Sequence, residues 1–481
     1  MNRTVDLTAP PAADTVAGLL QAARVVDDAL LLKVLQVALD ERRRDVVWLA
    51  LALLHPELPV MIEVERVLRR LRLDGPAVVL AEQHTLVTPT ARPLPALHDR
   101  LVLGGTLVDV HGMLDTTSSG GHHRVVGESL RRWAATQDCR VVGWTGQLDG
   151  LRDLDGAEHQ HLTGMPARSA PSLSLIPWHC TYVLPEVALT ADRQQRLSAM
   201  AEAGVIRLGA VVYDLVPITA GETAGPTLPG TFATYLGLLR YATTLAAIST
   251  SSATEYHGWC AMLAGQGLTG PQVVQVPLPA EPVDVGAEDM LAARAQLRIG
   301  ELPMVLAVGT HGPRKNLLAL LHAAELLWRD GLEFCLVLVG HSGEAAQEFL
   351  DRVAVLTATG RALVLVDDAS EALLWASYHT ARVVAFPSLH EGFALPVAEA
   401  LACGTPVVTS NVGSMLQLAL EGGALAVDPF DDHALTEALR TVLTDDAVHA
   451  ELSAAARART VRTWDVYAAE AWRALVGPDR P

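Results

Sequence analysis

Residues 382–410 read RVVAFPSLHEGFALPVAEALACGTPVVTS, and this stretch decides the fold class. It begins and ends with a short segment that is apolar along its whole length, which is typical of strands in a parallel sheet covered on both faces. Between these segments, Pro396 suits the first turn of a helix and Gly404 suits the left-handed residue after a helix end. The stretch therefore predicts strand, loop, two-turn helix and strand.

The same alternation fills residues 290–460. Further apolar strands are expected at 304–308, 334–340 and 362–366, with helices at 316–330, 344–357, 370–379 and 396–403. Strands that alternate with helices predict a doubly wound parallel sheet of the Rossmann-like kind.

Residues 105–285 repeat the pattern and predict a second Rossmann-like domain. Strands are expected at 106–110, 139–146, 172–178, 205–217 and 245–249, and helices at 124–136, 191–203 and 232–246. The Pro-rich run 277–286 is expected to link the two domains. Ligands of such sheets bind at the carboxyl ends of the strands, so the site is expected between the domains.

Residues 1–100 are expected to form a helical extension. Apolar residues recur at helical spacing through 19–39, 46–54 and 60–71, and Gly75 with the Pro/Thr-rich stretch 88–95 is expected to end the helices. Three roles stay open for the extension: formation of a homo-oligomer, docking of an acceptor, or bracing of the neighbouring domain.

Composition narrows the class of partner. The net charge of −18 argues against nucleic acid, and half the residues are apolar, enough for two or three domain cores. The five cysteines form no CxxC pair and are interpreted as reduced core residues, with no metal site. The N-terminus lacks an apolar signal segment, so we expect a cytoplasmic protein, or one peripheral at the membrane.

Two glutamates flank the start of the short helix predicted after residue 395. A helix N-terminus favours an anion such as a diphosphate. Glu399 lies in the first turns, and side chains lean toward the helix N-terminus, so its carboxylate can reach a ribose diol. Glu391 lies in the preceding loop and could accept hydrogen bonds from sugar hydroxyls.

A cationic element follows the strand at 304–308. Residues 309–316 read GTHGPRKN, which begins with Gly309 and places Arg314 and Lys315 just before the next helix. Fixed cations stabilise a phosphate leaving group as its bond to the sugar breaks. Lys315 is one of only two lysines in the chain, against 34 arginines.

These elements resemble the nucleotide-binding half of the retaining GT-B glycosyltransferases of family 4. VGTHGPRKN, LVLVGHSG, LAVDPFDD and the 382–410 stretch all fit its pattern, while LVDVHGML, SGGHHRVV and VVYDLVP fit the other half more loosely. The resemblance covers about 375 residues and leaves out 1–100. Residues 461–481, with TWDVYAAEAW, are similar to a closing helix that packs back toward the N-terminal domain.

The resemblance implies roles for the candidate residues. Arg314 and Lys315 would hold the donor diphosphate, Glu391 would contact the sugar, and Glu399 would hold the ribose. The remaining donor-binding residues would be the backbone of Gly392, Phe393, Ala394 and Leu395, with Val366, Asp367 and Asp368 near the base. Retention of anomeric configuration without a bound metal or other cofactor is also implied.

The N-terminal half supplies weaker candidates. Gly120 and Gly121 lie on the first strand–helix loop, where backbone can approach a ligand closely; a plain turn is the alternative. His122 and His123 follow and are interpreted mainly as solvent-exposed; the alternative is that one of them faces the cleft between the domains. His179 and Asp214 each end a predicted strand and are expected to face the acceptor, with a core histidine and a loop cap as the alternatives.

The sequence thus predicts transfer of a hexose or deoxyhexose from a GDP-, UDP- or dTDP-sugar to a hydroxyl acceptor. The acceptor would be a sugar, a lipid-linked molecule or a small molecule, as in polysaccharide or glycoconjugate biosynthesis. The alternatives are a phosphorylase or epimerase on the same scaffold, and a catalytically inactive partner subunit. Three departures from the family pattern are Tyr213 for a usual histidine, Ala394 for a usual glycine, and Gln417 near a usual glutamate.

Overall fold

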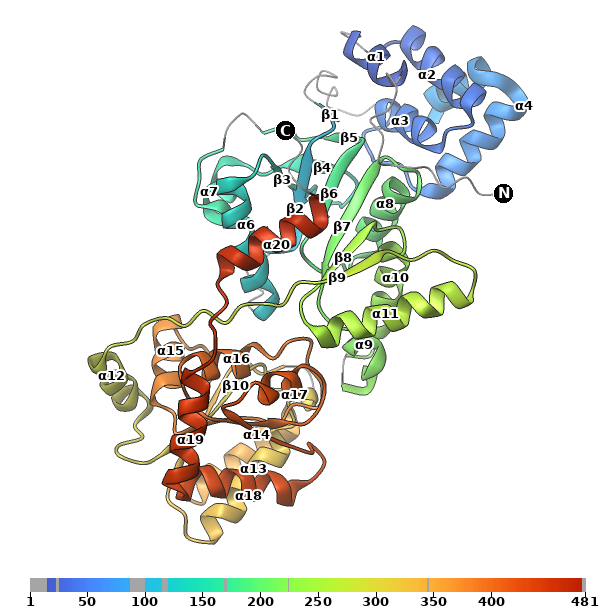
Figure 1. Cartoon of the computed structure of the whole chain (residues 1–481). Helices are drawn as coiled ribbons and strands as arrows, with labels where there is room; N and C mark the ends of the chain where they lie inside the picture. The colour runs from blue at the N-terminus through green and yellow to red at the C-terminus, as the bar shows by residue number, and fades with distance from the viewer. Residues whose placement is uncertain are drawn as a thin grey trace.

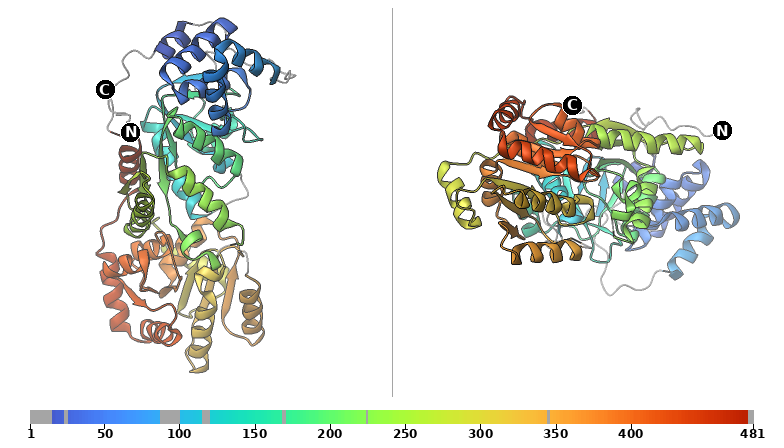
Figure 2. Two further views of the ribbon diagram at one scale, coloured as in Figure 1. Left: turned by 90° about the vertical axis from the view of Figure 1, so that its right-hand side faces the viewer. Right: turned by 90° about the horizontal axis from the view of Figure 1, so that it is seen from below.

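The computed structural model has two parallel sheets, each covered by helices, and a small helical unit at one end (Figure 1). It describes residues 15–22, 26–86, 100–114, 120–167, 171–223, 225–343 and 346–477. The helical unit, the N-terminal domain and the C-terminal domain follow one another along the molecule (Figure 2).

The sheet of the N-terminal domain has seven strands in the order β4-β3-β2-β6-β7-β8-β9. All neighbours pair parallel except β3 and β4, which pair antiparallel. The strands are β2 (Thr106–Asp109), β3 (Arg140–Trp144), β4 (Leu151–Asp153), β6 (Cys180–Leu184), β7 (Ile206–Val212), β8 (Thr244–Ala247) and β9 (Gln272–Gln275). The longer helices of this domain are α6 (Gly121–Thr136), α7 (Gly156–Thr163), α8 (Ala191–Glu202), α10 (Leu228–Leu239) and α11 (Thr250–Gly265).

The sheet of the C-terminal domain has six parallel strands in the order β12-β11-β10-β13-β14-β15. They are β10 (Met304–Val308), β11 (Cys335–Val339), β12 (Leu363–Val366), β13 (Val383–Phe386), β14 (Val407–Ser410) and β15 (Ala424–Val427). Its helices are α12 (Ala287–Leu297), α13 (Leu317–Arg329), α14 (Gln347–Ala358), α15 (Glu371–Thr380), α16 (Leu395–Ala402), α17 (Gly413–Leu420), α18 (Asp432–Thr444) and α19 (Asp446–Arg457). Two separate apolar clusters fill its interior, so the sheet is buried on both faces.

The predicted fold of two Rossmann-like domains is therefore confirmed. The main difference lies at 232–246, where a single helix was expected. Helix α10 ends at Leu239, and β8 begins at Thr244. The turn at 240–243 between them lets β8 pair with β7 in the sheet. Because apolar residues lie on both sides of this turn, the spacing of apolar residues does not reveal it.

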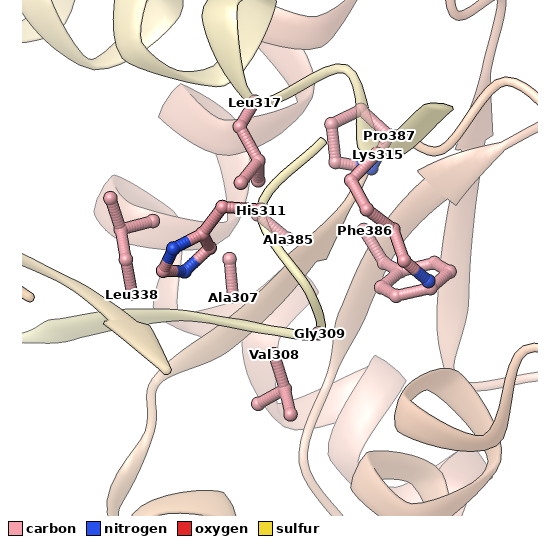
Figure 3. Close-up of a pocket in the computed structure, with 10 residues that line it drawn as sticks. All are labelled: Ala307, Val308, Gly309, His311, Lys315, Leu317, Leu338, Ala385, Phe386 and Pro387. Carbon is pink, nitrogen blue, oxygen red and sulfur yellow. The ribbon is translucent and has the colours of Figure 1, made fainter. Parts of the chain in front are cut away.

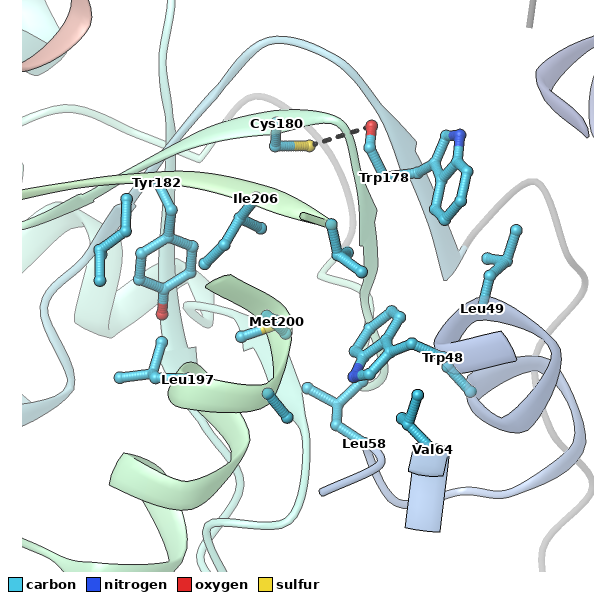
Figure 4. Close-up of a cluster of buried hydrophobic side chains, with 14 of the residues drawn as sticks. Trp48, Leu49, Leu58, Val64, Trp178, Cys180, Tyr182, Leu197, Met200 and Ile206 are labelled. Atoms are coloured by element: carbon cyan, nitrogen blue, oxygen red, sulfur yellow. Dashed lines mark hydrogen bonds between the residues drawn. The ribbon is translucent and has the colours of Figure 1, made fainter. Parts of the chain in front are cut away.

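The helical unit consists of α1 (Thr15–Ala22), α2 (Asp28–Glu41), α3 (Arg44–Leu54) and α4 (Met61–Leu86). The expected helix end at Gly75 is correct: Gly75 has non-helical backbone angles (φ 78°, ψ 170°), and a second helical segment of α4 follows it to Leu86. Trp48 on α3 shares one apolar core with Trp178 and Met200 of the N-terminal domain (Figure 4). The unit thus braces that domain. The stretch 88–95 lies outside the described residues.

The chain crosses between the two domains twice. It passes from β9 through residues 276–286 into α12, and it returns after α19 into α20 (Trp464–Val476). Helix α20 packs against α6, β7 and β8 of the N-terminal domain (Figure 1). Trp133 on α6 donates from Nε1 to the carbonyl of Ala468 at 2.8 Å. In the described part of the chain, no helix has the length and apolar character needed to span a membrane.

Candidate functional site at the domain junction

The loop from β13 to α16 lies where the two domains meet. Helix α16 has eight residues, and Pro396 lies in its first turn. Ala394 precedes the helix with φ 68°, the left-handed region that a glycine occupies more easily. Gly404 follows the helix with φ 77°, and a Cβ there would lie 2.6 Å from Cγ of Arg457. The loop and helix therefore have the form that the sequence predicts.

A cluster of two cations surrounds one carboxylate in this loop. Oε1 of Glu391 lies 2.6 Å from a guanidinium nitrogen of Arg314 and 2.6 Å from Nζ of Lys315. Ser388 donates its hydroxyl to the same oxygen at 2.7 Å. Arg314 also donates to the carbonyl of His390 at 2.9 Å. The adjacent strands β10 and β13 thus bring the two predicted elements into direct contact.

The electrostatics of this cluster keep Glu391 ionised. Burial would raise the pKa of the Glu391 carboxyl, but Lys315 and Arg314 outweigh burial and lower the pKa to about 2. Burial lowers the pKa of Lys315, against the opposing effect of Glu391. Two cations face the carboxylate of Glu391 here. Cations held in fixed positions suit an anionic ligand.

The absence of a side chain at Gly309 allows the Lys315 side chain to reach Glu391. Gly309 has φ 138°, and a Cβ there would lie 3.1 Å from Cε of Lys315. The Lys315 side chain passes over this bare backbone and places its ammonium 4.7 Å from the centre of the Phe386 ring (Figure 3). A side chain at position 309 would displace the lysine, which is a physical reason for glycine at the end of β10.

The carboxyl end of β7 closes on the same loop from the N-terminal domain. A Cβ at Gly392 would lie 2.9 Å from Oδ2 of Asp214 and 3.1 Å from the carbonyl oxygen of Tyr213. Asp214 is thus placed beside Glu391 and Arg314, as its strand-end position predicts. Burial raises the pKa of Asp214, and Arg314 opposes that effect.

Serine hydroxyls hold the loop backbone from both sides of the junction. Ser249 and Ser252, at the start of α11, donate to the carbonyl of Gly392 at 2.5 and 3.1 Å. Ser414 on α17 donates to the carbonyl of Glu391 at 2.8 Å. The position of the loop is therefore fixed by both domains.

The first turn of α6 lies against the start of α16. A Cβ at Gly121 would lie 3.2 Å from Cδ1 of Leu395, while Gly120 leaves open space. Phe393 and Leu395 pack against the apolar core of the N-terminal domain. His122 remains exposed and places its ring edge-on to Tyr213, with centroids 4.3 Å apart. His122 thus lies beside the junction, as in the alternative that one of the two histidines faces the cleft.

Glu399 is buried in the first turns of α16, with a side chain only 6% exposed. Tyr378 donates its hydroxyl to Oε2 of Glu399 at 2.8 Å, and Arg124 on α6 donates to Oε1. Burial raises the pKa of Glu399, against the opposing effect of Arg124. The carboxylate predicted to hold a ribose is thus already paired across the domain junction.

Val366 and Asp367 lie at the carboxyl edge of the same sheet but farther from the cluster. Val366 ends β12, the outermost strand beyond β11 and β10. The Asp367 side chain is 73% exposed and lies 3.9 Å from Nδ1 of His341.

The expectation for His179 is wrong. The strand expected at 172–178 is the short β5 (Ile176–Trp178), and His179, with φ 54°, lies between it and the start of β6. It therefore lies at the amino end of β6, opposite the junction. Its ring stacks on Trp178 with centroids 4.4 Å apart, and its Nε2 lies 3.4 Å from Asp45 of the helical unit. Its surroundings belong to the contact between that unit and the sheet.

A histidine–glutamate pair also links the domains. Nε2 of His390 lies 2.7 Å from Oε1 of Glu255 on α11, and Oε2 of Glu255 accepts from the amide of Leu215 at 2.8 Å. The hydrogen bond to Glu255 raises the pKa of His390 despite its burial. Asp214 and Glu391, which also face this ring, act in the same direction.

We expect this pair to make stability depend on pH. Because the folded pKa of His390 exceeds its unfolded value, its contribution is complete below that unfolded value and is lost as pH rises through the folded one. Between about pH 6 and pH 9 the loss should be on the order of 1 kcal/mol. Thermal melts of the wild type and His390→Gln should converge at the alkaline end. Parallel curves across this range would show that the pair contributes nothing.

The comparisons with known proteins agree with this geometry. A family model described as glycosyl transferases group 1 matches residues 289–459, which span the C-terminal sheet and its helices. The chain is similar to that family over these residues. O-antigen chain mannosyltransferase B of Escherichia coli is 37% identical over 145 residues, which are 30% of this chain and 37% of that protein. D-inositol 3-phosphate glycosyltransferase of Xylanimonas cellulosilytica is 35% identical over 199 residues, 40% of this chain and 46% of that protein. The chain thus spans less than half the length of each relative.

Solved structures resemble both domains together. Sucrose-phosphate synthase from Thermosynechococcus elongatus has a TM-score of 0.53 at 19% identity and covers 77% of this chain and 97% of its own. HepE of Anabaena, in complex with UDP and glucose, has a TM-score of 0.53 at 15% identity and covers 77% of this chain and 95% of its own. At such identities the likeness shows the GT-B fold, as predicted.

Several residues that contact the C-terminal domain or lie in it were not predicted from the sequence. Ser388 lies within the quoted stretch, and its place three residues before Glu391 was a usable signal. Arg124 lies within SGGHHRVV but 275 positions from its partner Glu399. Glu255 is also far from His390 in the sequence. Pairs between domains depend on the angle at which two sheets meet, which no local pattern encodes.

Proposed function

We propose that the chain transfers a hexose or deoxyhexose from a nucleoside diphosphate sugar to a hydroxyl group. The observation that carries the proposal is the buried cluster of Arg314, Lys315 and Glu391 beside the N-terminus of α16. A diphosphate there would meet two fixed cations and the free amides of the helix start. Glu399 on the same helix would accept hydrogen bonds from the ribose hydroxyls.

The chemistry follows from where charge develops. As the bond between the sugar and the diphosphate breaks, negative charge gathers on the leaving oxygen. Lys315 and Arg314 are held in place by Glu391 before the reaction begins, so they need little reorganisation to stabilise that charge. Because one oxygen of Glu391 already accepts three hydrogen bonds, Oε2 is the atom available to a sugar hydroxyl.

The acceptor would approach from the N-terminal domain. Asp214 lies in the N-terminal domain at the carboxyl end of β7, next to Gly392 and beside Arg314. Its carboxylate could orient the attacking hydroxyl there. We also propose that the anomeric configuration is retained and that no metal ion takes part, since two side-chain cations already face the leaving group.

The names of similar proteins suggest which nucleotide the donor carries and what kind of acceptor is used. Two of them are named as a mannosyltransferase of an O-antigen chain and a glycosyltransferase of D-inositol 3-phosphate. HepE binds UDP in its crystal. We therefore propose a GDP- or UDP-sugar as donor, with dTDP-sugars next, and a sugar, lipid-linked or small hydroxyl compound as acceptor.

A thermal-shift screen with UDP, GDP, dTDP and ADP tests this proposal. One nucleotide should raise the melting temperature, since a ligand at 100 times its Kd adds about 2.7 kcal/mol of stability. The shift should persist in EDTA. A shift that EDTA removes and Mn²⁺ restores would contradict the metal-free assignment, and no shift with any nucleotide would contradict the donor site itself.

A further inference from the structure

The carboxylate assigned to the ribose is occupied by the protein's own side chain. Oε1 of Glu399 accepts from Arg124, and Oε2 accepts from Tyr378 at 2.8 Å. Arg124 belongs to the N-terminal domain, whereas Glu399 and Tyr378 belong to the C-terminal domain. A ribose diol donates its hydrogen bonds to the same two oxygens, so Arg124 and a nucleoside need the same partner.

The surroundings of Arg124 hold its guanidinium at this place. Its central carbon lies 5.4 Å from the ring centre of Trp375 on α15 and 5.8 Å from that of Trp464 at the start of α20. These distances fit cation–π contacts. The Arg124 side chain is 28% exposed, so one edge still faces solvent. Arg124 can therefore lose its hydrogen bond to Glu399 while its guanidinium stays between the two aromatic rings.

The pair also joins the two domains. Arg124 follows Gly121, which lies against Leu395, by one helical turn. Trp464 lies where the chain re-enters the N-terminal domain, and its amide donates to Glu281 of the first crossing segment at 3.1 Å. The bond between Arg124 and Glu399 therefore lies next to both crossings, where a change in the angle between the domains begins.

We propose that Arg124 occupies the nucleoside end of the donor site and competes with the donor ribose for Glu399. This inference rests on the proposed function. When no donor is present, the bond keeps Glu399 neutralised and holds the domains at the angle described here. When a nucleotide binds, the ribose takes the carboxylate and the interdomain bond is released. Nucleotide binding is thereby coupled to the angle between the domains, and its affinity is lowered by the competition.

Removing the competitor should therefore tighten binding. In calorimetric titrations, Arg124→Met should bind the preferred ribonucleotide among UDP, GDP and ADP, each of which carries a ribose diol, about 10-fold more tightly than the wild type. The gain should shrink for the 2′,3′-dideoxy form of that nucleotide, which has no diol. Arg124→Lys keeps the charge without the planar fork and serves as a second variant, with circular dichroism confirming that each is folded.

Arg131→Met is the matched control, because Arg131 lies on the same helix and pairs with Glu128 at the surface, 54% exposed. It should leave the affinity unchanged. Equal or weaker binding by folded Arg124 variants would overturn the competition and leave the donor site standing. A wild type that binds none of UDP, GDP, dTDP and ADP would overturn the proposed function and the competition together.

Discussion

Lys315→Met is expected to lower kcat for sugar transfer by about 10³-fold, with the fold retained. The ammonium of Lys315 is one of two cations aimed at the proposed leaving group, and it reaches the cluster across the backbone of Gly309. Methionine keeps the length of the side chain and its contact with Phe386. The loss should therefore report charge at the site and not a cavity.

Lys33→Met is the natural control for this variant. Lys33 is the only other lysine in the chain. It lies exposed on α2 of the helical unit, far from the C-terminal domain in sequence and in space. Initial rates with a radiolabelled nucleotide sugar should match the wild type for Lys33→Met. Rates for Lys315→Met within about threefold of the wild type, well short of the loss expected of a missing transition-state cation, would remove Lys315 from the reaction.

Glu391→Gln is expected to separate binding from transfer. Glutamine keeps the shape of the side chain but removes the carboxylate that pairs with Arg314 and Lys315. Breaking a buried ion pair in this way costs about 3–5 kcal/mol of stability. A diphosphate restores the missing negative charge, so the variant should bind the nucleoside diphosphate more tightly than the wild type while kcat falls by about 10²-fold.

Denaturant melts with and without the nucleotide, together with titrations and rates, test this expectation. Glu421→Gln offers a matched control, because Glu421 pairs with Arg459 at the surface and is 66% exposed. Near-wild-type turnover by Glu391→Gln would take Glu391 out of the site. Weaker nucleotide binding would show that Glu391 orders the cations more than it neutralises them.

The donor half could be read from the sequence because its signals are local. The strand, the loop, Pro396 and Gly404 each constrain a few neighbouring residues, and the structure has the predicted arrangement there. Arg314 and Lys315 could be placed beside Glu391 because β10 and β13 both end at the same edge of a parallel sheet.

The acceptor half could not be read in the same way. For His179 only the strand before it is expected from the sequence, and the structure adds β6 directly after it, which places His179 at the amino end of that strand. Arg124 lies within SGGHHRVV, but nothing in that stretch indicates its partner, which depends on the angle between two domains. The helix end at Gly75 could be predicted because a glycine followed by a proline stops most helices.

A crystal structure with the preferred nucleoside diphosphate tests the central claim most directly. We expect the diphosphate to lie between Lys315, Arg314 and the N-terminus of α16. The ribose hydroxyls should donate to Glu399 in place of Arg124. A diphosphate bound elsewhere, for example in the hollow lined by Arg140 and Asp153 at the far end of the N-terminal sheet, would contradict it.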